Sequence, residues 1–197
     1  MGPSAAIEVL REAAMDGADH LYLISDDVYA GSDTLATSRV IASALDYIER
    51  PPLVLCGRRA IDGETGQVGP ETSVLLGYHC VTNVISIEEV NTGQVTVKRL
   101  LETKIQTLSV PLPAVICVCE TNILSQLPSL NNIRRAATMP IQVLSNNELK
   151  IQPEQCGAGG SPTRVMRIHR KSMERRKAQY ADQEEGIRIL ETLLEKR

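Results

Sequence analysis

The sequence predicts an α/β protein with an open, mainly parallel, doubly wound sheet, followed by a C-terminal arm. Short apolar runs over residues 20–25, 53–56 and 114–119 are typical of buried strands, and amphipathic helical segments alternate with the first two of them. After about residue 146 the chain becomes polar. We therefore expect an α/β domain over residues 1–150 and an arm over residues 151–197.

The first half of the chain alternates helix and strand. Its expected elements are a helix from Ser4 to about Met15, a strand over 20–25, a helix over 34–49, a strand over 53–56 and a helix from Pro70 to Gly77. Ser4 is expected to cap the first helix, and Ser32 or Asp33 the second. Polar loops over residues 25–34 and 57–69 both follow strands, so we expect them at the same edge of one sheet.

The pattern changes in the second half. Residues 81–88 and 94–101 alternate like two strands around a turn at Asn91-Thr92-Gly93. A strand over 114–119, a short helix over 128–137 and a strand over 141–144 are expected next. Residues 157–162 form a glycine-rich, flexible loop in this interpretation. An amphipathic helix over about 182–196 closes the chain.

Composition excludes some functions. The 197 residues include no Trp, no Phe and only five Tyr, and the formal net charge is −3. Nucleic-acid binding is not expected, because aromatic stacking platforms and a net positive charge are both missing. The basic run over residues 164–177 is interpreted either as a patch that steers an anionic partner or as a solvated arm.

The cysteines and the N-terminus indicate a reducing compartment. The five cysteines are scattered, and the three histidines are not spaced to complete a zinc site. We expect reduced thiols and no metal. The first residues do not follow the pattern of a signal peptide, and no apolar run reaches the ~18 residues of a membrane span. A cytoplasmic protein without membrane insertion is expected.

The loop over residues 57–69 carries the strongest functional signal. Gly63, Gly66 and Gly69 allow close approach of the backbone to a ligand, and a helix is expected to follow directly. The loop matches neither a Walker motif nor a dinucleotide-binding turn. Two interpretations stay open from the residues alone: a site for a nucleotide or another anionic ligand, and a long structural loop.

The same loop, Gly57-Arg58-Arg59-Ala60-Ile61-Asp62-Gly63-Glu64-Thr65-Gly66-Gln67-Val68-Gly69-Pro70, closely resembles the adenine-nucleotide loop of the electron-transfer flavoprotein beta (small) subunit. Further matches follow in order along nearly the whole chain, at residues 25–26, 31–38, 112–115, 127–136, 156–157 and 160–165. The resemblance implies a nucleotide-binding fold of the adenine-nucleotide alpha-hydrolase-like type. The form of the loop and the Gly-Ser-Pro-Thr segment are nearer to the bifurcating branch of the family.

The resemblance also implies the functional residues. Those expected to contact the cofactor are Met1, Asp33, Thr34, Thr37, Gly57, Arg58, Arg59, Ala60, Ile61, Asp62, Gly63, Glu64, Thr65, Gly66, Gln67 and Val68. Thr121 and Asn122 match the loop by which members dock on partner dehydrogenases. No side chain is expected to act as a catalytic acid or base, because a flavin carries the electrons.

The resemblance implies a subunit of a heterodimer rather than a stand-alone enzyme. Members pair with an alpha subunit, which the C-terminal arm is expected to contact, and shuttle electrons from acyl-CoA or other dehydrogenases to downstream acceptors through FAD. The beta subunit holds AMP or, in the bifurcating branch, a second FAD that exchanges a hydride with NAD(H).

Two departures from the family pattern bear on this reading. The family's first strands have no counterpart ahead of Met1, so a shortened domain with a weakened nucleotide pocket is expected. Ile123-Leu124-Ser125 replaces the usual Glu-Pro-Arg of the docking loop. Two alternatives therefore stay open: a non-redox adenine-nucleotide-binding module, and a shortened remnant of the family. Asp26 and Asp27 are interpreted either as ligands of a cofactor hydroxyl or as a simple strand end.

Overall fold

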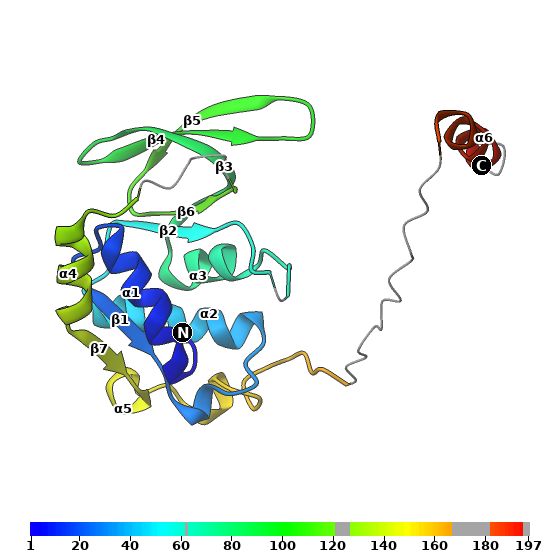
Figure 1. Ribbon diagram of the computed structural model, residues 1–197. Helices are drawn as coiled ribbons and strands as arrows, with labels where there is room; N and C mark the ends of the chain where they lie inside the picture. Colours follow the sequence, from blue (N-terminus) through cyan, green and yellow to red (C-terminus); the bar gives the residue numbers. More distant parts are fainter. Residues whose placement is uncertain (62, 121–126, 167–181, 195–197) are drawn as a thin grey trace. The chain divides into compact units, whose positions relative to one another are not determined.

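The computed structural model of the chain describes residues 1–61, 63–120, 127–166 and 182–194 (Figure 1). It divides into two units, residues 1–164 and residues 165–197. The described helix of the second unit is α6 (Gln183–Leu194). No helix in the described ranges combines the length and the apolar character needed to cross a membrane.

The first helix begins differently from the prediction. Residues Ser4–Ala6 form a 3-10 turn, and helix α1 follows over Ile7–Met15. Ser4 makes no capping hydrogen bond, so the expected cap is wrong: the residue lies inside the 3-10 turn instead of ahead of the helix. α1 packs on α4 (Leu130–Thr138), which is capped by Ser129. Ala14, Leu21 and Ala136 are buried at the core of this contact.

The predicted strands divide between two sheets. Strand β1 (Leu21–Ile24) pairs in parallel with β7 (Ile141–Leu144) and with no other strand of the described chain. Strand β2 (Leu53–Gly57) belongs to a second sheet, in the order β2-β6-β3-β4-β5. The expectation that residues 25–34 and 57–69 follow strands of one sheet is therefore wrong. Local apolar patterns identify strands, but they do not determine which strands become neighbours.

The second sheet is mixed and open. Parallel pairs join β2 to β6 (Ala114–Val118) and β6 to β3 (His79–Val90). Antiparallel pairs join β3 to β4 (Gln94–Leu100) and β4 to β5 (Ile105–Pro111). Strand β5 was not expected from the sequence. Val84, Val95, Val97 and Ile116 form the fully buried centre of the core on this sheet.

Two helices connect the sheets. Helix α2 (Thr34–Tyr47) is capped by the side chain of Asp33, as predicted, and packs on α3 (Val68–Leu76). α3 begins ahead of the expected Pro70 and ends as expected at Gly77, which has the left-handed backbone of a C-cap. α3 also packs on β3 and β6 of the larger sheet.

The end of the first unit is a packed segment. A short helix α5 (Asn146–Leu149) follows β7 and carries a capping box made by Ser145 and Glu148. Tyr29 of the 3-10 turn Asp27–Tyr29 contacts Asn146 of α5 and packs with Ile151 and Cys156, which flank a further 3-10 turn over Pro153–Gln155. Cys156, Gly157, Gly160 and Ser161 are buried. The glycine-rich segment predicted as a flexible loop is thus packed against the start of α2.

Candidate functional site

The polar loop between β2 and α3 is the most exposed part of the predicted site. Residues 57–61 and 63–65 are exposed, and the Ile61 side chain is 100% exposed. The loop is held at its start by the Arg58 amide, which donates to the carbonyl of Val118 at 2.8 Å. A salt bridge of 3.3 Å joins Arg59 to Glu64. The exposed residues of this loop are available to a ligand.

Gly66 shows why a glycine is needed near the end of this loop. Its φ of +64° lies in the left-handed region, and an added Cβ would come within 3.2 Å of the carbonyl oxygen of Arg58. The turn brings the backbone of residues 65–67 back toward the start of the loop. The loop is therefore folded on itself ahead of helix α3.

The start of α2 meets the end of the loop. The Thr34 hydroxyl donates to Oε1 of Gln67 at 3.1 Å and lies 3.3 Å from Oε1 of Glu71. The other carboxylate oxygen of Glu71 accepts a hydrogen bond from Ser38 at 2.9 Å. The structure therefore brings the two predicted loop regions together. They meet through the packing of α2 on α3 and not through a common sheet.

The Asp33 carboxylate has a structural role: it caps α2 and holds the segment around Thr163. One carboxylate oxygen accepts from the Ala36 amide, and the other from the amide and the hydroxyl of Thr163 at 3.0 and 2.8 Å. Burial opposes ionisation, but hydrogen bonds from Ala36, Thr163 and Leu35 hold the pKa of Asp33 below its ordinary value. Ser161 accepts from the Asp33 amide at 2.8 Å. The Gly-Ser-Pro-Thr segment is thereby fixed beside the start of α2.

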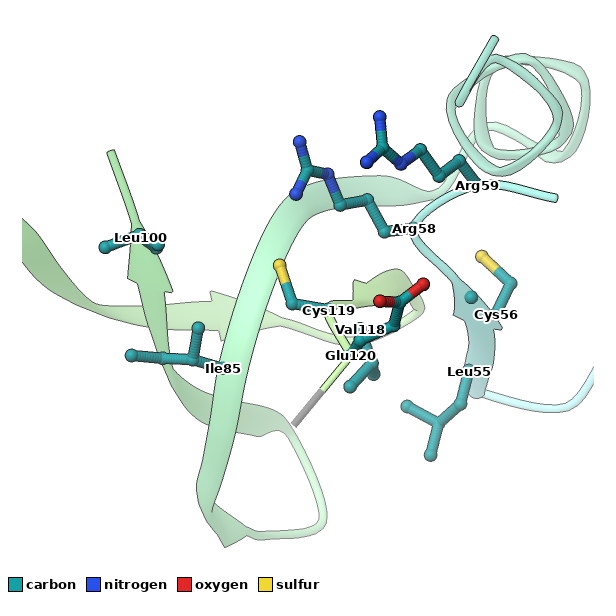
Figure 2. A pocket seen from close by; sticks show the side chains of 10 residues that line it. Leu55, Cys56, Arg58, Arg59, Ile85, Leu100, Val118, Cys119 and Glu120 are labelled. Carbon is teal, nitrogen blue, oxygen red and sulfur yellow. The ribbon is translucent and has the colours of Figure 1, made fainter. Parts of the chain in front are cut away.

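A cavity of about 570 Å³ lies between the loop and the larger sheet (Figure 2). Its aliphatic lining comes from four strands, and its polar lining from the ends of β2 and β6. The lining residues are Leu55, Cys56, Gly57, Arg58, Arg59, Ile85, Leu100, Val118, Cys119 and Glu120. Figure 2 shows the Arg58 and Arg59 guanidinium groups together at one side, away from Leu55, Ile85 and Leu100. A ligand with an apolar part and an anionic part fits this distribution of groups.

Met1 lies at a different place. It lines a smaller cavity of about 270 Å³ with residues 2–3 and 24–27, at the end of β1. Burial lowers the pKa of its amino group. The residues that line this cavity do not include any residue of the loop over 57–67. The structure therefore does not bring Met1 into the same cavity as Arg58 and Arg59.

Asp26 serves as a structural acceptor. It accepts from the amides of Val28 at 3.0 Å and Asn146 at 2.9 Å. The hydrogen bond from Asn146, followed by the one from Val28, lowers the pKa of this carboxyl. It caps the 3-10 turn at the end of β1 and attaches α5 to it. The strand-end interpretation therefore accounts for Asp26.

Three of the predicted residues fall outside the described part. Asp62 of the loop and the predicted docking residues Thr121 and Asn122 lie outside the described residues. Thr37 is half-buried in the first turn of α2, one turn beyond Asp33. The assignment of these residues to cofactor or partner contacts stays a prediction.

The sequence did not identify three residues of the site. Glu71 lies in the first turn of α3, accepts a hydrogen bond from Ser38 and lies 3.3 Å from the Thr34 hydroxyl. A Ser or Thr on one helix and a Glu on another give no local signal of contact. Cys119 and Glu120 join the Arg58 cavity because they follow β6, the neighbour of β2. Knowledge of the strand order would have predicted this proximity, because residues that follow adjacent parallel strands lie side by side at one edge of the sheet.

The arrangement is suited to holding an anionic ligand. Two helix N-termini meet near Thr34 and Gln67, and two arginine side chains lie at the other end of the loop. Helix N-termini and guanidinium groups both favour phosphate. The Glu71 carboxylate is already engaged by two hydroxyl groups. The residues present fit a phosphate-bearing ligand as a class.

Comparisons with known proteins point to one family. A family model described as "Electron transfer flavoprotein domain" matches residues 1–149. The caffeyl-CoA reductase-Etf complex subunit CarD of Acetobacterium woodii is 38% identical over 168 residues, which cover 85% of this chain and 63% of that protein.

Two other relatives agree. The electron transfer flavoprotein subunit beta of Thermoanaerobacterium thermosaccharolyticum is 34% identical over 176 residues, covering 89% of this chain and 67% of that protein. Protein FixA of Azorhizobium caulinodans is 34% identical over 189 residues, covering 92% of this chain and 67% of that protein. The chain thus spans about two thirds of the length of the relatives it matches.

Proposed function

Because this chain belongs to the electron transfer flavoprotein domain family, we propose that it is the beta-type subunit of a heterodimeric electron carrier. The resemblance inferred from the loop over residues 57–70 is confirmed by the comparisons. On this proposal the chain passes electrons between a dehydrogenase or reductase and a downstream acceptor, in complex with an alpha subunit. We propose that the working complex is cytoplasmic.

The observation that carries the proposed site is the contact of Thr34 with Gln67 in a chain of this family. It joins the start of α2 to the exposed loop, where the family resemblance expects an adenine nucleotide. The proposed ligand is an adenosine phosphate, either as AMP or as the AMP half of a second FAD. The two helix starts would face its phosphate, and the loop backbone would follow its ribose and base.

The family is one of flavoproteins, and the flavin supplies the electron-transfer chemistry when it is bound. The residues of this chain only bind and orient. Gly66 allows the loop to fold back, Thr34 and Gln67 fix its end, and Arg58 and Arg59 add positive charge beside it. In the form of the site that holds a second FAD, NAD(H) would be the hydride donor.

Relatives suggest the kind of partner. Two of them are named as parts of a caffeyl-CoA reductase complex and of an acryloyl-CoA reductase. We accordingly expect an acyl-CoA dehydrogenase or reductase as the electron partner of this chain. Thr121 and Asn122 are proposed as docking residues, and residues 151–197 as the contact with the alpha subunit.

Cofactor content tests the proposal. The chain is co-expressed with a candidate alpha subunit, the complex is purified, and acid-released FAD and AMP are quantified by chromatography. One FAD with one AMP, or two FAD per heterodimer, is the expected result, and the choice between them identifies the ligand of the loop. A complex without adenosine phosphate at this subunit, or no complex at all, would contradict the proposal and favour the shortened-remnant alternative.

A further inference from the structure

Three cysteines of the larger sheet lie on one face. Cys56 on β2 and Cys117 on β6 are direct partners in the parallel register. Cys80 on β3 is paired with Val115 of β6. Val115 lies two residues before Cys117, so the side chains of these two residues point to the same face of the sheet. Since the side chains of paired residues point to the same face, all three thiols face α3. The opposite face carries the aliphatic core around Ile116.

Two of these thiols are close. The Sγ atoms of Cys56 and Cys117 are 3.5 Å apart. Neighbouring strands lie roughly 4.8 Å apart, within the Cα separations of roughly 4.4 to 6.8 Å that a disulfide spans. The two sulfur atoms can therefore bond after side-chain adjustment, without the strands separating.

Gly69 packs directly against the sulfur atoms of Cys56 and Cys117. A Cβ added to Gly69 would lie 2.5 Å from Sγ of Cys117 and 2.8 Å from Sγ of Cys56. Gly69 is in the first turn of α3, directly after the polar loop. The first turn of α3 therefore packs directly against both sulfur atoms. A movement of either sulfur atom would displace this turn and, with it, the end of the loop that precedes it.

The thiols of Cys56 and Cys117 differ in exposure and in pKa. Cys56 is half-buried, whereas Cys117 is buried, with 1% of its surface exposed. Hydrogen bonding to Cys117 lowers the pKa of Cys56 and lowers the pKa of Cys80 to about 6. The same contacts raise the pKa of Cys117. A half-buried thiol whose pKa is lowered thus lies beside a buried thiol whose pKa is raised, an arrangement suited to an attacking and a resolving cysteine.

A metal site is not the better interpretation of this cluster. Among the described residues, no group of three or more His, Cys, Asp or Glu side chains is placed to hold a metal ion. Oxidation requires only two sulfur atoms within reach of each other and an opening for a small oxidant. The 3.5 Å separation of the Sγ atoms of Cys56 and Cys117 meets the first condition, and the partial exposure of Cys56 meets the second.

We propose that Cys56 and Cys117 form a reversible disulfide when the protein meets a peroxide. The Cys56 thiolate attacks one peroxide oxygen and becomes a sulfenic acid, and the other oxygen leaves as hydroxide, which takes up a proton to form water. The Cys117 sulfur then attacks the Cys56 sulfur, loses its proton, and a second water leaves. In sum, two thiols and one hydrogen peroxide give one disulfide and two waters. A dithiol reductant returns both thiols by exchange.

The test uses the purified chain treated with hydrogen peroxide, alkylated under denaturing conditions and digested with trypsin. Cys56 and Cys80 fall in separate tryptic peptides, residues 40–58 and 60–98, while Cys117 shares residues 105–134 with Cys119. The expected product links peptide 40–58 to peptide 105–134, with the mass lowered by two hydrogen atoms. Dithiothreitol should remove the link.

Variants assign the link to its residues. Cys119→Ser is the matched control, since Cys119 lies two residues after Cys117 in the same tryptic peptide, and it should leave the cross-link unchanged. Cys117→Ser should abolish the link and leave Cys56 as a sulfenic acid that dimedone traps. If Cys117→Ser does not fold, Cys56→Ser, at the half-buried position, serves instead, and it should also abolish the cross-link.

Three results would overturn the proposal. One is full alkylation of peptides 40–58 and 105–134 after peroxide treatment. Another is a link that joins peptide 60–98 to peptide 105–134, which would assign the pair to Cys80. The third is a link that persists in Cys117→Ser but is lost in Cys119→Ser. None of these readings depends on a bound nucleotide or on the alpha subunit.

Discussion

The carboxylate of Asp33 accepts two hydrogen bonds from Thr163, a residue 130 positions later in the chain. The same carboxylate caps α2 through the amide of Ala36. One side chain therefore fixes both the start of the helix that contacts the loop and the Gly-Ser-Pro-Thr segment beside it. The loss of an N-cap costs about 0.5–2 kcal/mol.

We therefore expect Asp33→Ala to lower the free energy of unfolding by about 1–2 kcal/mol, measured by urea denaturation. Asp33→Asn should lose less, because asparagine also caps helices. Asp27→Ala is the matched control: its side chain is exposed at the start of a 3-10 turn, and a change within about 0.5 kcal/mol is expected. A loss in Asp33→Ala no larger than in the control would contradict this role.

Acid should remove the contribution of Asp33. Its pKa is lowered in the folded state, so its stabilising contribution is present above the ordinary value of 3.8 and is lost as the pH falls through the folded value. The stability difference between the wild-type chain and Asp33→Asn should thus be constant from about pH 7 to about pH 5 and shrink below about pH 4. A difference that grows on acidification would have the wrong sign.

Gly69→Ala should be destabilising, because its new methyl group would overlap the sulfur atoms of Cys56 and Cys117. Overpacking of this kind costs about 1–3 kcal/mol. Gly93→Ala, with no atom within 4 Å of the added Cβ, serves as the control. The double variant Gly69→Ala with Cys117→Ala should lose less stability than the sum of the single variants, as a double-mutant cycle would show. Strict additivity would refute the contact.

Adenine-nucleotide binding should depend on the contact between α2 and the loop. In the complex with the alpha subunit, Thr34→Val and Gln67→Ala should each weaken AMP binding by about tenfold, equivalent to about 1.4 kcal/mol, as measured by calorimetry. Val74→Ala, on an α3 position that is 79% exposed, should bind AMP like the wild type. Equal affinity in all three variants would place the nucleotide elsewhere.

Local signals in the sequence predicted most elements. Asp33 and Gly77 act as helix caps where expected, and the strands near residues 21–24, 53–57 and 114–118 were identified from apolar runs. These features depend on neighbours within a few residues, so the sequence pattern contains them. Strand β5 was missed, because Pro111 and Pro113 obscured its pattern and its partner β4 had to be known first.

Contacts between distant parts of the chain could not be predicted in the same way. The separation of β1 from β2 is a matter of pairing, and so is the meeting of Cys56 with Cys117. For the candidate site, the family resemblance supplied the loop, but the Glu71 contacts and the separate position of Met1 required the fold. Residue type alone does not indicate which helix will pack against which.

The pairing of β1 with β7 also determines an order of events. All five strands of the larger sheet lie between them in sequence. The hydrogen bond from the Asn146 amide to the Asp26 carboxylate likewise joins residues 120 positions apart. Closing so long a loop is entropically slow compared with closing the hairpins of β3, β4 and β5. During synthesis the larger sheet can therefore form from residues 53–118 before β7 has left the ribosome and can pair with β1. Within the described chain the β1–β7 pair is therefore the last strand pair that can form, and the link between the two ends of the first unit is completed only after the larger sheet has been synthesised.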